Sequence, residues 1–462
     1  MILALLALTA PAAVPEPLGP EDIAFDDLSE GAPLAGPWWT TFGDPALDAL
    51  IEEALASNHD LASARERVRQ AEALSLQAAA RLSPTASFDV TTSGQPAKTA
   101  FRCAVGPIDP AQLTNADTAS GLCWTGSAQL VAAWPVDWTG RQWFQSEAAR
   151  HDLRASRADA DQAALLLSTT VTEAWLDVVA ADQRLLRLGE QLEAQSALLE
   201  VLELRYGQGG TGGVEVLQQR QAVSATRATL PVARSLRRTR AQALAVLLGR
   251  DPAQVPEIAA ELPEPSPTPD AGSAEELVER RPDLRAARER LEAADARHTS
   301  ATLALLPSLR LNAAAGWQYA VGTELTTIDV WSIGGAVSVP LFNGGLLHGQ
   351  VKQASGAEAA AVHAFDQALL GASRDVRAAL VLEEERDQQL AATRDQVEAA
   401  RLAWDSSRDR FLEGLEPYLT VLVAQNAVQA AELQLVQAHR DRLGARVQLH
   451  SALGGPLVGV SP

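Results

Sequence analysis

The chain has 462 residues and a formal net charge of −20, with 47% hydrophobic and 5% aromatic residues. Because it offers no basic stripe that could neutralise phosphates, its composition excludes a general nucleic-acid-binding protein. The abundance of Ala, Leu, Glu, Gln and Arg favours long helices. The acidity is compatible with solubility alone, and also with a water-filled passage that favours cations.

The first 14 residues are a signal-like segment. Residues 1–8 are apolar and 10–12 read as a small-residue cleavage signal, although a basic n-region is missing. The apolar stretch is too short to span a bilayer, and no other run of ~20 apolar residues occurs. No cysteine lies near the start, so we expect no lipid anchor there. Residues 15–44 are expected to form an extended N-terminal segment.

One unit is used twice in the chain. Asn58–Leu61 returns as Arg281–Leu284, 223 positions later, and Arg205 returns as Arg410, 205 positions later. Repeats decide the architecture. We therefore divide the chain into a first repeat at 45–250, a linker at 251–270, a second repeat at 271–456 and a tail at 457–462.

Each repeat is expected to run helix, strand, loop, strand, very long helix, Gly-rich turn, helix. The ~66 residues of the first long helix would extend roughly 100 Å. The expected helices of the two repeats are 45–82, 141–206, 214–249, 271–305, 346–413 and 418–453, and the expected strands are 85–93, 124–135, 308–320 and 329–341.

The first long helix carries a heptad seam, in which apolar residues step alternately by four and three from Leu167 to Tyr206. A seam of this length needs a partner. The simplest assembly stacks two short helices end to end beside each long one. The second long helix has a blurred seam, because Glu383 and Arg386 stand where apolar residues are expected. The linker 251–270 contains six prolines and is expected to pass outside the helices.

The chain has two cysteines, Cys103 and Cys123, in one inter-strand loop. We expect an intramolecular disulfide that closes an insertion in an exported protein. Two unpaired thiols are the alternative, and a metal pair is disfavoured because no histidine lies close by.

The strands alternate apolar residues with small or polar ones. Trp317, Tyr319 and Trp331 lie near the loop end of the apolar face, as in the aromatic girdle of a membrane β-barrel. A half-buried soluble hairpin would alternate in the same way. Four strands cannot close a barrel, and lipid does not tolerate open edges. The chain must therefore oligomerise: two copies would supply eight strands and three would supply twelve.

The sequence shows no catalytic constellation. Its seven histidines are scattered without metal-ligand spacing, and no serine elbow, phosphate loop or paired-carboxylate pocket stands out. We expect neither an enzyme nor a site for a metal or cofactor.

Several stretches together resemble the TolC-like outer-membrane efflux ducts, and more closely their OprM-like branch. They occur in the family's order and spacing: Trp39–Pro45, Asn58–Leu61, Arg281–Leu284, Leu306–Ser308, Pro340–Gly345 and Tyr418–Gln425. The resemblance implies an α-helical tunnel plus a membrane β-barrel, with four strands per protomer and twelve in a homotrimer. It implies an outer-membrane location in a Gram-negative bacterium, a periplasmic adaptor protein and an inner-membrane pump of the resistance–nodulation–division type. The OprM-like branch often has a lipidated N-terminal cysteine, which this chain lacks.

The resemblance also implies two functional regions at the Gly-rich turns. Adaptor contacts are expected at the tips, at Tyr206, Gly209, Gly210, Thr211, Gly212, Gly414 and Leu415. Plain hairpin turns are the alternative. A periplasmic gate is expected at Glu215, Phe411, Glu413 and Glu416. Phe411 stands where TolC has a tyrosine, so that hydroxyl bond cannot form. Three copies of Glu416 would make an anionic ring, whereas Glu413 and Glu416 could also be solvated turn charges.

The function expected from these features is the exit duct of a tripartite efflux system that passively conducts small molecules. One alternative is an exit duct for type I protein secretion, which would share the fold. Another is a periplasmic coiled-coil scaffold without a pore.

Overall fold

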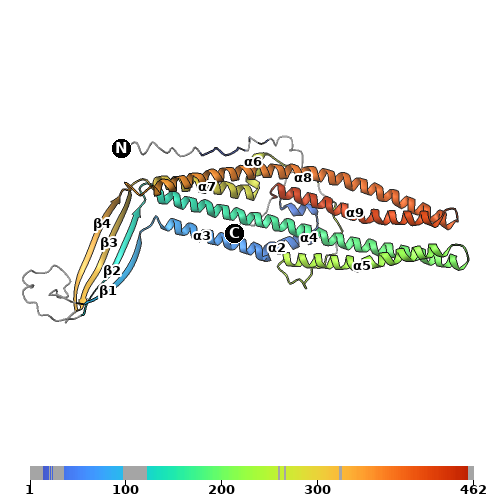
Figure 1. Ribbon diagram of the computed structural model, residues 1–462, viewed down its shortest axis with the longest axis horizontal. Coiled ribbons are helices and arrows are strands. Elements are labelled where there is room, and N and C mark those ends of the chain that lie inside the picture. Colours follow the sequence, from blue (N-terminus) through green and yellow to red (C-terminus); the bar gives the residue numbers. More distant parts are fainter. Residues whose placement is uncertain are drawn as a thin grey trace, which may run out of the picture. The chain divides into compact units, whose positions relative to one another are not determined.

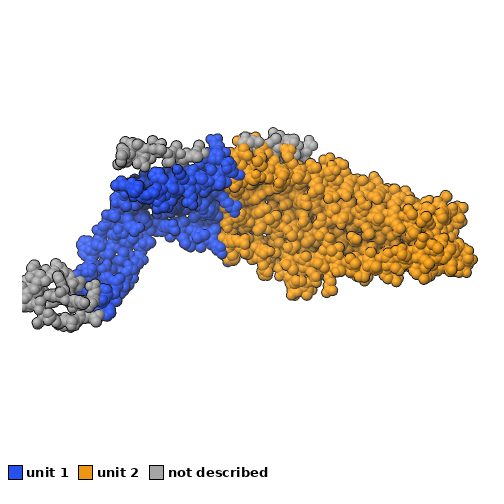
Figure 2. All heavy atoms as spheres, in the orientation of Figure 1, with its two compact units in different colours: residues 1–16, 69–154, 288–363 blue, residues 17–68, 155–287, 364–462 orange. Residues whose placement is uncertain are grey.

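The computed structural model describes residues 14–19, 21, 23, 36–96, 122–258, 261–264, 267–321 and 325–455. The chain forms two compact units (Figure 2), of which unit 1 comprises 1–16, 69–154 and 288–363 and unit 2 comprises 17–68, 155–287 and 364–462. Both units draw on both sequence repeats. Cys103, most of the signal-like segment and the tail 457–462 lie outside the described residues, and so therefore does the predicted disulfide between Cys103 and Cys123.

Unit 1 contains a four-stranded antiparallel sheet in the order β1-β2-β3-β4 (Figure 1). The strands are β1 (Thr85–Pro96), β2 (Leu122–Val136), β3 (Ser308–Val321) and β4 (Leu325–Ser338). β4 begins and ends earlier than the predicted 329–341. It stops before Pro340, which has no N–H to donate to a ladder. Within the described residues, β1 and β4 each pair on one side only.

Two helices have 67 residues and two have 35. The long ones are α4 (Arg141–Gly207) and α8 (Leu346–Leu412), and each contributes to both units. The short ones, α5 (Gly213–Leu247) and α9 (Tyr418–Ala452), lie in unit 2. One window of α4 is long and apolar enough to cross a membrane, but 67% of it is buried inside the protein, as in a core helix.

The predicted helices 45–82 and 271–305 are each broken in two. The first becomes α2 (Pro45–Ser57) and α3 (His59–Ala80), and the second becomes α6 (Ala274–Arg280) and α7 (Pro282–Leu303). At the first break, Asn58 is extended and its Oδ1 accepts bonds from the backbone N–H groups of residues 60 and 61. At the second, Arg281 is extended, because the residue before a proline avoids the helical region.

Both breaks join a short helix to the end of another. Asn58 Nδ2 donates to the carbonyl oxygen of Leu247 at 2.9 Å, and Arg281 Nη1 donates to that of Ala452 at 2.9 Å. These acceptors are the last residues of α5 and α9, and they stand 205 positions apart in the repeat. The side chains at the breaks therefore hold the short helices end to end.

Each junction passes through a glycine in the left-handed region. Gly249 has a φ of +73° and Gly454 has one of +69°. A Cβ on Gly249 would lie 2.5 Å from the carbonyl oxygen of Ser57, and one on Gly454 would lie 2.9 Å from the Cα of Arg281. A side chain would therefore meet both a conformational penalty and a backbone clash.

The N-terminal segment is not extended throughout, contrary to expectation. Residues Trp38–Phe42 form a 3₁₀ helix, η2, because three large aromatic rings at 38, 39 and 42 are buried in the core of unit 2. The Trp38 ring lies 5.4 Å from the imidazole of His450, and its Nε1 donates to Ser168 Oγ at 3.2 Å.

The blurred seam of α8 is explained by a buried ion network. Glu383 is 3% exposed and accepts from Arg446 Nε, and Arg442 lies beside it and also pairs with Asp387. Burial lowers the pKa of the Arg446 guanidinium, and the Glu383 carboxylate opposes that shift. Arg446 Nη1 also donates to the carbonyl of Pro267 at 2.9 Å. The network thus fastens the linker to the helices of unit 2.

Burial lowers the pKa of His450 to about 3, and the positive charge of Arg446 adds to this effect. The imidazole is therefore neutral in the folded protein, while the unfolded chain binds a proton below its ordinary pKa of about 6.5. Stability is then lost as the pH falls from about 6.5 towards 3.

We predict that His450→Phe, which keeps a ring against Trp38, flattens this dependence. Between pH 7.5 and 5 the wild type should lose about 2 kcal/mol more unfolding free energy than the variant. Denaturant unfolding of detergent-solubilised protein, followed by circular dichroism, measures the difference. The exposed His59 provides the control, as His59→Phe. Parallel pH profiles for wild type and His450→Phe would contradict the assignment.

Candidate functional site

The sheet has one apolar and one polar face. Residues directly opposite each other in a ladder share a face, so the register places each side chain. Phe88 opposes Leu130, and Ala315 opposes Trp331, all on the apolar face. The other face is lined by small and polar residues, among them Ser87, Thr91, Gln129, Asn312 and Gln318. Strands of 12 to 15 residues exceed the ~9–11 that cross a hydrocarbon core.

The predicted girdle residues lie together on the apolar face. Trp317 is 55% exposed and Trp331 is 78% exposed. Tyr319 is partly buried, because its hydroxyl reaches across β2 and donates to the Thr91 carbonyl oxygen at 3.2 Å. A Cβ at Gly126 would lie 2.4 Å from that hydroxyl, so the glycine leaves room for the ring.

Sequence reasoning missed a further aromatic residue near the loop end of this face. Trp124 opposes Val321, next to the pair formed by Gly126 and Tyr319, and it is largely exposed. Its position as the first residue of the predicted strand 124–135 was the available signal. The apolar face thus carries aromatic side chains on three of its four strands near the loop end.

Two turns of the same construction join the long helices to the short ones. Gly209 has a φ of +75° and Gly414 one of +78°, a conformation that favours glycine. The following residues close the helices: Gly210 N–H donates to the Arg205 carbonyl at 2.8 Å and Leu415 N–H to the Arg410 carbonyl at 2.9 Å. The predicted tip residues are exposed or, for Thr211, partly exposed: Tyr206, Gly209, Gly210, Thr211, Gly212, Gly414 and Leu415.

Arg205 links the two tips. Its Nη1 donates to the Phe411 carbonyl at 3.0 Å, and its Nη2 donates to the carbonyl of Leu412. Its guanidinium carbon lies 5.0 Å from the centre of the Phe411 ring, within the range of a cation–π interaction. Because α8 ends at Leu412, this cation also faces the negative end of the α8 dipole.

Tyr418 lies among Phe411, Glu215 and Gln219 near the two turns, and we call this group the tip cluster. Its ring packs 6.0 Å from that of Phe411, and its hydroxyl donates to Gln219 Oε1 at 2.7 Å. Burial raises the pKa of Tyr418 to about 12, and the nearby Glu215 carboxylate contributes. Glu215 folds back over Gly212, and its Oε2 is buried without a hydrogen-bond partner among the described residues.

The remaining two predicted gate acids differ from each other. Glu416 Oε1 accepts from Arg410 Nε at 3.0 Å, while its Oε2 is buried without a partner in the described part of the chain. Glu413 is exposed in the turn. The structure therefore brings Glu215 and Phe411 to the two sides of Tyr418 and ties Glu416 to its own hairpin.

A layer of glutamines lies between the tip cluster and the core near η2. Gln219 Nε2 donates to the Gln195 carbonyl at 2.7 Å, Gln195 Nε2 to Gln429 Oε1 at 2.9 Å, and Gln191 Nε2 to the Gln429 carbonyl at 3.1 Å. Gln425 is fully buried, and both of its side-chain polar atoms lack partners among the described residues. Hydrogen bonds of this kind can be exchanged for bonds to water, unlike interlocked apolar contacts.

Sequence reasoning missed Arg205, Arg410, Tyr418 and Gln219 as tip residues. The repeat contained a signal for the two arginines, because Arg205 and Arg410 occupy equivalent positions. Nothing in the sequence pattern indicated the bond from Tyr418 to Gln219, which joins two helices 199 positions apart. No cluster of metal-ligating side chains occurs in the described ranges.

Comparisons with known proteins give a consistent result. The family model for outer membrane efflux protein matches residues 50–250 and 274–455. The chain is 32% identical over 426 residues to the pyoverdine export outer membrane protein OpmQ of Pseudomonas putida, covering 92% of this chain and 89% of that protein. It is 28% identical over 428 residues to the solvent efflux pump outer membrane protein SrpC of Pseudomonas putida, covering 90% and 86%. The solved outer-membrane channel OprN is similar with a TM-score of 0.83 and 26% identity, over 93% and 94% of the two chains.

A sheet with one apolar and one polar face, together with paired helical hairpins, defines an outer-membrane channel with a periplasmic tunnel. The chain belongs to the outer membrane efflux protein family. Its proteins are efflux channels of the outer membrane. The expected fold class, α-helical tunnel plus membrane β-barrel, and the expected outer-membrane location are confirmed.

We predict that Tyr418→Phe loosens the tip. It leaves the buried amide oxygen of Gln219 without a donor, which should cost about 1–3 kcal/mol. Amide hydrogen exchange of residues 195–225 and 405–430 should accelerate in the variant. Tyr206→Phe, at an exposed tyrosine of the neighbouring turn, is the matched control. Equal exchange in Tyr418→Phe and wild type would show that this bond does not hold the tip.

Proposed function

We propose that three copies of the chain form a homotrimer that serves as the exit duct of a tripartite efflux system. The observation that carries this proposal is the sheet. It has an apolar face, interrupted near the loop end by Asp329 opposite Trp317, and two edge strands, β1 and β4, each paired on one side only within the described residues. Twelve strands would close a barrel and satisfy both edges, since unpaired strand groups are not tolerated in lipid.

The partners follow from the tips and from the relatives. The exposed residues Tyr206 and Leu415 project from the two turns and offer apolar contact area to a periplasmic adaptor. One relative is a pyoverdine export protein and another belongs to a solvent efflux pump, which favours small molecules over polypeptides as cargo. We propose an inner-membrane pump of the resistance–nodulation–division type behind the adaptor.

The test combines mass with conductance. Purified protein in detergent should have the mass of three chains, and it should form discrete ion-conducting channels in planar bilayers. A trimer that conducts supports the duct. A protein extracted in aqueous buffer without detergent, and without conductance, would support the scaffold instead. Co-purification with an ABC exporter rather than with the pump would favour type I secretion.

We further propose that the tip cluster is the gate, with Glu215, Phe411, Glu413 and Glu416 as its residues. Two interactions support this proposal. Arg410 is paired with Glu416, and Arg205 grips the end of α8 at Phe411. The Arg205 contact joins the two hairpins and must break if they separate, whereas the Arg410–Glu416 pair lies within one hairpin and fixes the position of the Glu416 carboxylate. The half-buried Glu416 and Glu215 carboxylates would become solvated in the open state, which lowers the cost of opening.

We predict that Glu416→Gln reduces cation selectivity and increases the open fraction. The change removes three negative charges from a proposed ring and weakens the contact that holds Arg410. Reversal potentials under a salt gradient measure selectivity, and single-channel records measure the open fraction. Glu413→Gln, an exposed acid of the same turn, is the matched control. A current–voltage curve identical to wild type would remove Glu416 from the gate.

A further inference from the structure

The helices of unit 2 form a row whose two outer members are α5 and α8. Ion pairs define the order: Arg237 of α5 pairs with Asp182 of α4 at 2.9 Å. Arg440 of α9 pairs with Asp177 of α4 at 2.7 Å, and Arg401 of α8 pairs with Glu432 of α9 at 2.7 Å. The order is therefore α5, α4, α9, α8, and the outer flanks of α5 and α8 are the ends at which a ring of copies would close.

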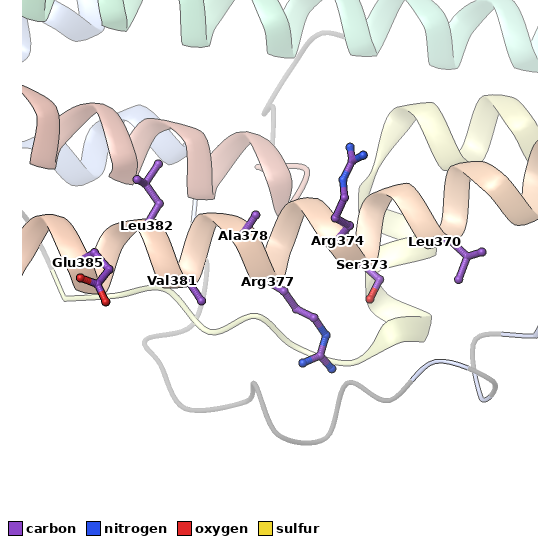
Figure 3. Close-up of a pocket in the computed structure, with 8 residues that line it drawn as sticks. All are labelled: Leu370, Ser373, Arg374, Arg377, Ala378, Val381, Leu382 and Glu385. Carbon is purple, nitrogen blue, oxygen red and sulfur yellow. The ribbon is translucent and has the colours of Figure 1, made fainter.

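The α8 flank is a shallow groove (Figure 3). It includes Leu370 and Val381, which are 50% and 60% exposed, and it ends at Glu385. Two arginines also line it: Arg374, which pairs with Asp375, and Arg377. The α5 flank presents Val232, which is 69% exposed, between two arginines at 227 and 234. Both flanks therefore present apolar side chains that are available for contact with another surface.

The two flanks carry opposite unpaired charges. Arg227 and Arg234 on α5 are exposed, and neither has an ion-pair partner among the described residues. On α8, Glu385 and Asp395 are exposed and equally unpaired within those ranges. Helix α5 as a whole contains six arginines and one acid, in a chain whose net charge is −20. Its most available acidic counterpart is therefore another surface of the same chain.

The internal repeat supplies the register of the contact. Because Arg205 recurs as Arg410, helix α4 corresponds to α8, and α9 corresponds to α5. The seam between α4 and α9 within one copy is thus a template for a seam between α8 of one copy and α5 of the next. Shifting the pair Asp177 and Arg440 by this offset of 205 leads to Leu382 and Ser235. Arg234 is adjacent to Ser235, and the unpaired Glu385 lies three positions from Leu382, on the same side of α8.

A second contact between α4 and α9 gives the same register between α8 and α5. Gln191 and Gln429, which are hydrogen-bonded at 3.1 Å, shift to Gln396 and Ser224. Asp395 is adjacent to Gln396, and Arg227 lies three positions from Ser224, on the same side of α5. One rise along the helix is ~1.5 Å, and an arginine side chain is several times longer, so both pairs lie within reach.

We infer that α5 of one copy docks against the α8 groove of a second copy, with the ion pairs Arg234–Glu385 and Arg227–Asp395 across the seam. This inference rests on the proposed homotrimer and names the contacts that close it. Exposed ion pairs contribute little binding energy each. Their role is to select the register between the copies. A slip of one heptad would place Ala378 or Ala392 opposite Arg234, and Gln388 or Leu402 opposite Arg227, so neither arginine would meet an acid.

The test is charge reversal with rescue. The variant Arg227→Glu/Arg234→Glu should weaken the trimer. The protein concentration at which it dissociates on dilution in detergent should rise by on the order of tenfold. Adding Glu385→Arg/Asp395→Arg should restore the wild-type behaviour. Arg184→Glu, at an exposed arginine of α4, is the control and should have no effect.

Cross-linking provides the second measurement. In a background with both native cysteines replaced by serine, Arg234→Cys/Glu385→Cys should give disulfide-linked dimers and trimers under mild oxidation. Absence of cross-links, together with an unshifted trimer in the charge-reversed variant, would overturn the seam and leave the trimer itself standing. A monomeric wild type would instead overturn the proposed function.

Discussion

Backbone hydrogen bonding in lipid is the constraint on which the rest of this structure depends. Every N–H and C=O group that a strand presents to the hydrocarbon core must find a partner, because no water is available there. The sheet satisfies its inner ladders completely but leaves β1 and β4 at its edges within the described residues. A channel built from this chain therefore needs strands from other copies, and the helices must be arranged so that they can close around the same axis.

The two sequence repeats build the helical part of the chain with one set of contacts that is used twice. Asn58 and Arg281 perform the same joining role with different chemistry, an amide in one repeat and a guanidinium in the other. Gly249 and Gly454 turn the chain at equivalent points. In the proposed homotrimer, such equivalence lets a helix-to-helix seam inside one copy serve as the template for the seam between copies, as in other repeat assemblies where neighbouring interfaces are alike.

The departures from equivalence are concentrated at the tips and at the linker. Arg205 reaches the neighbouring hairpin, whereas its counterpart Arg410 turns back to Glu416 in its own hairpin. The buried acid Glu383 interrupts the seam of α8 and, through Arg446, anchors the linker. Removing one partner of such a buried group is costly, so this network makes the middle of unit 2 rigid. The glutamine layer towards the tips is easier to rearrange, because its hydrogen bonds can be exchanged for bonds to water.

The sequence by itself determined the element order, the two-faced strands and the long helical hairpins, because these depend on local periodicity and on a repeat visible in the letters. It also indicated the tips, since glycine is required where φ is positive. Only the tertiary structure decided that Asn58 and Arg281 bond to the ends of α5 and α9, that Glu383 is paired, and that Tyr418 and Arg205 hold the tip. Those outcomes depend on side chains brought together from residues up to 207 positions apart. No local sequence pattern encodes these long-range contacts, because each one is fixed by the packing of whole helices.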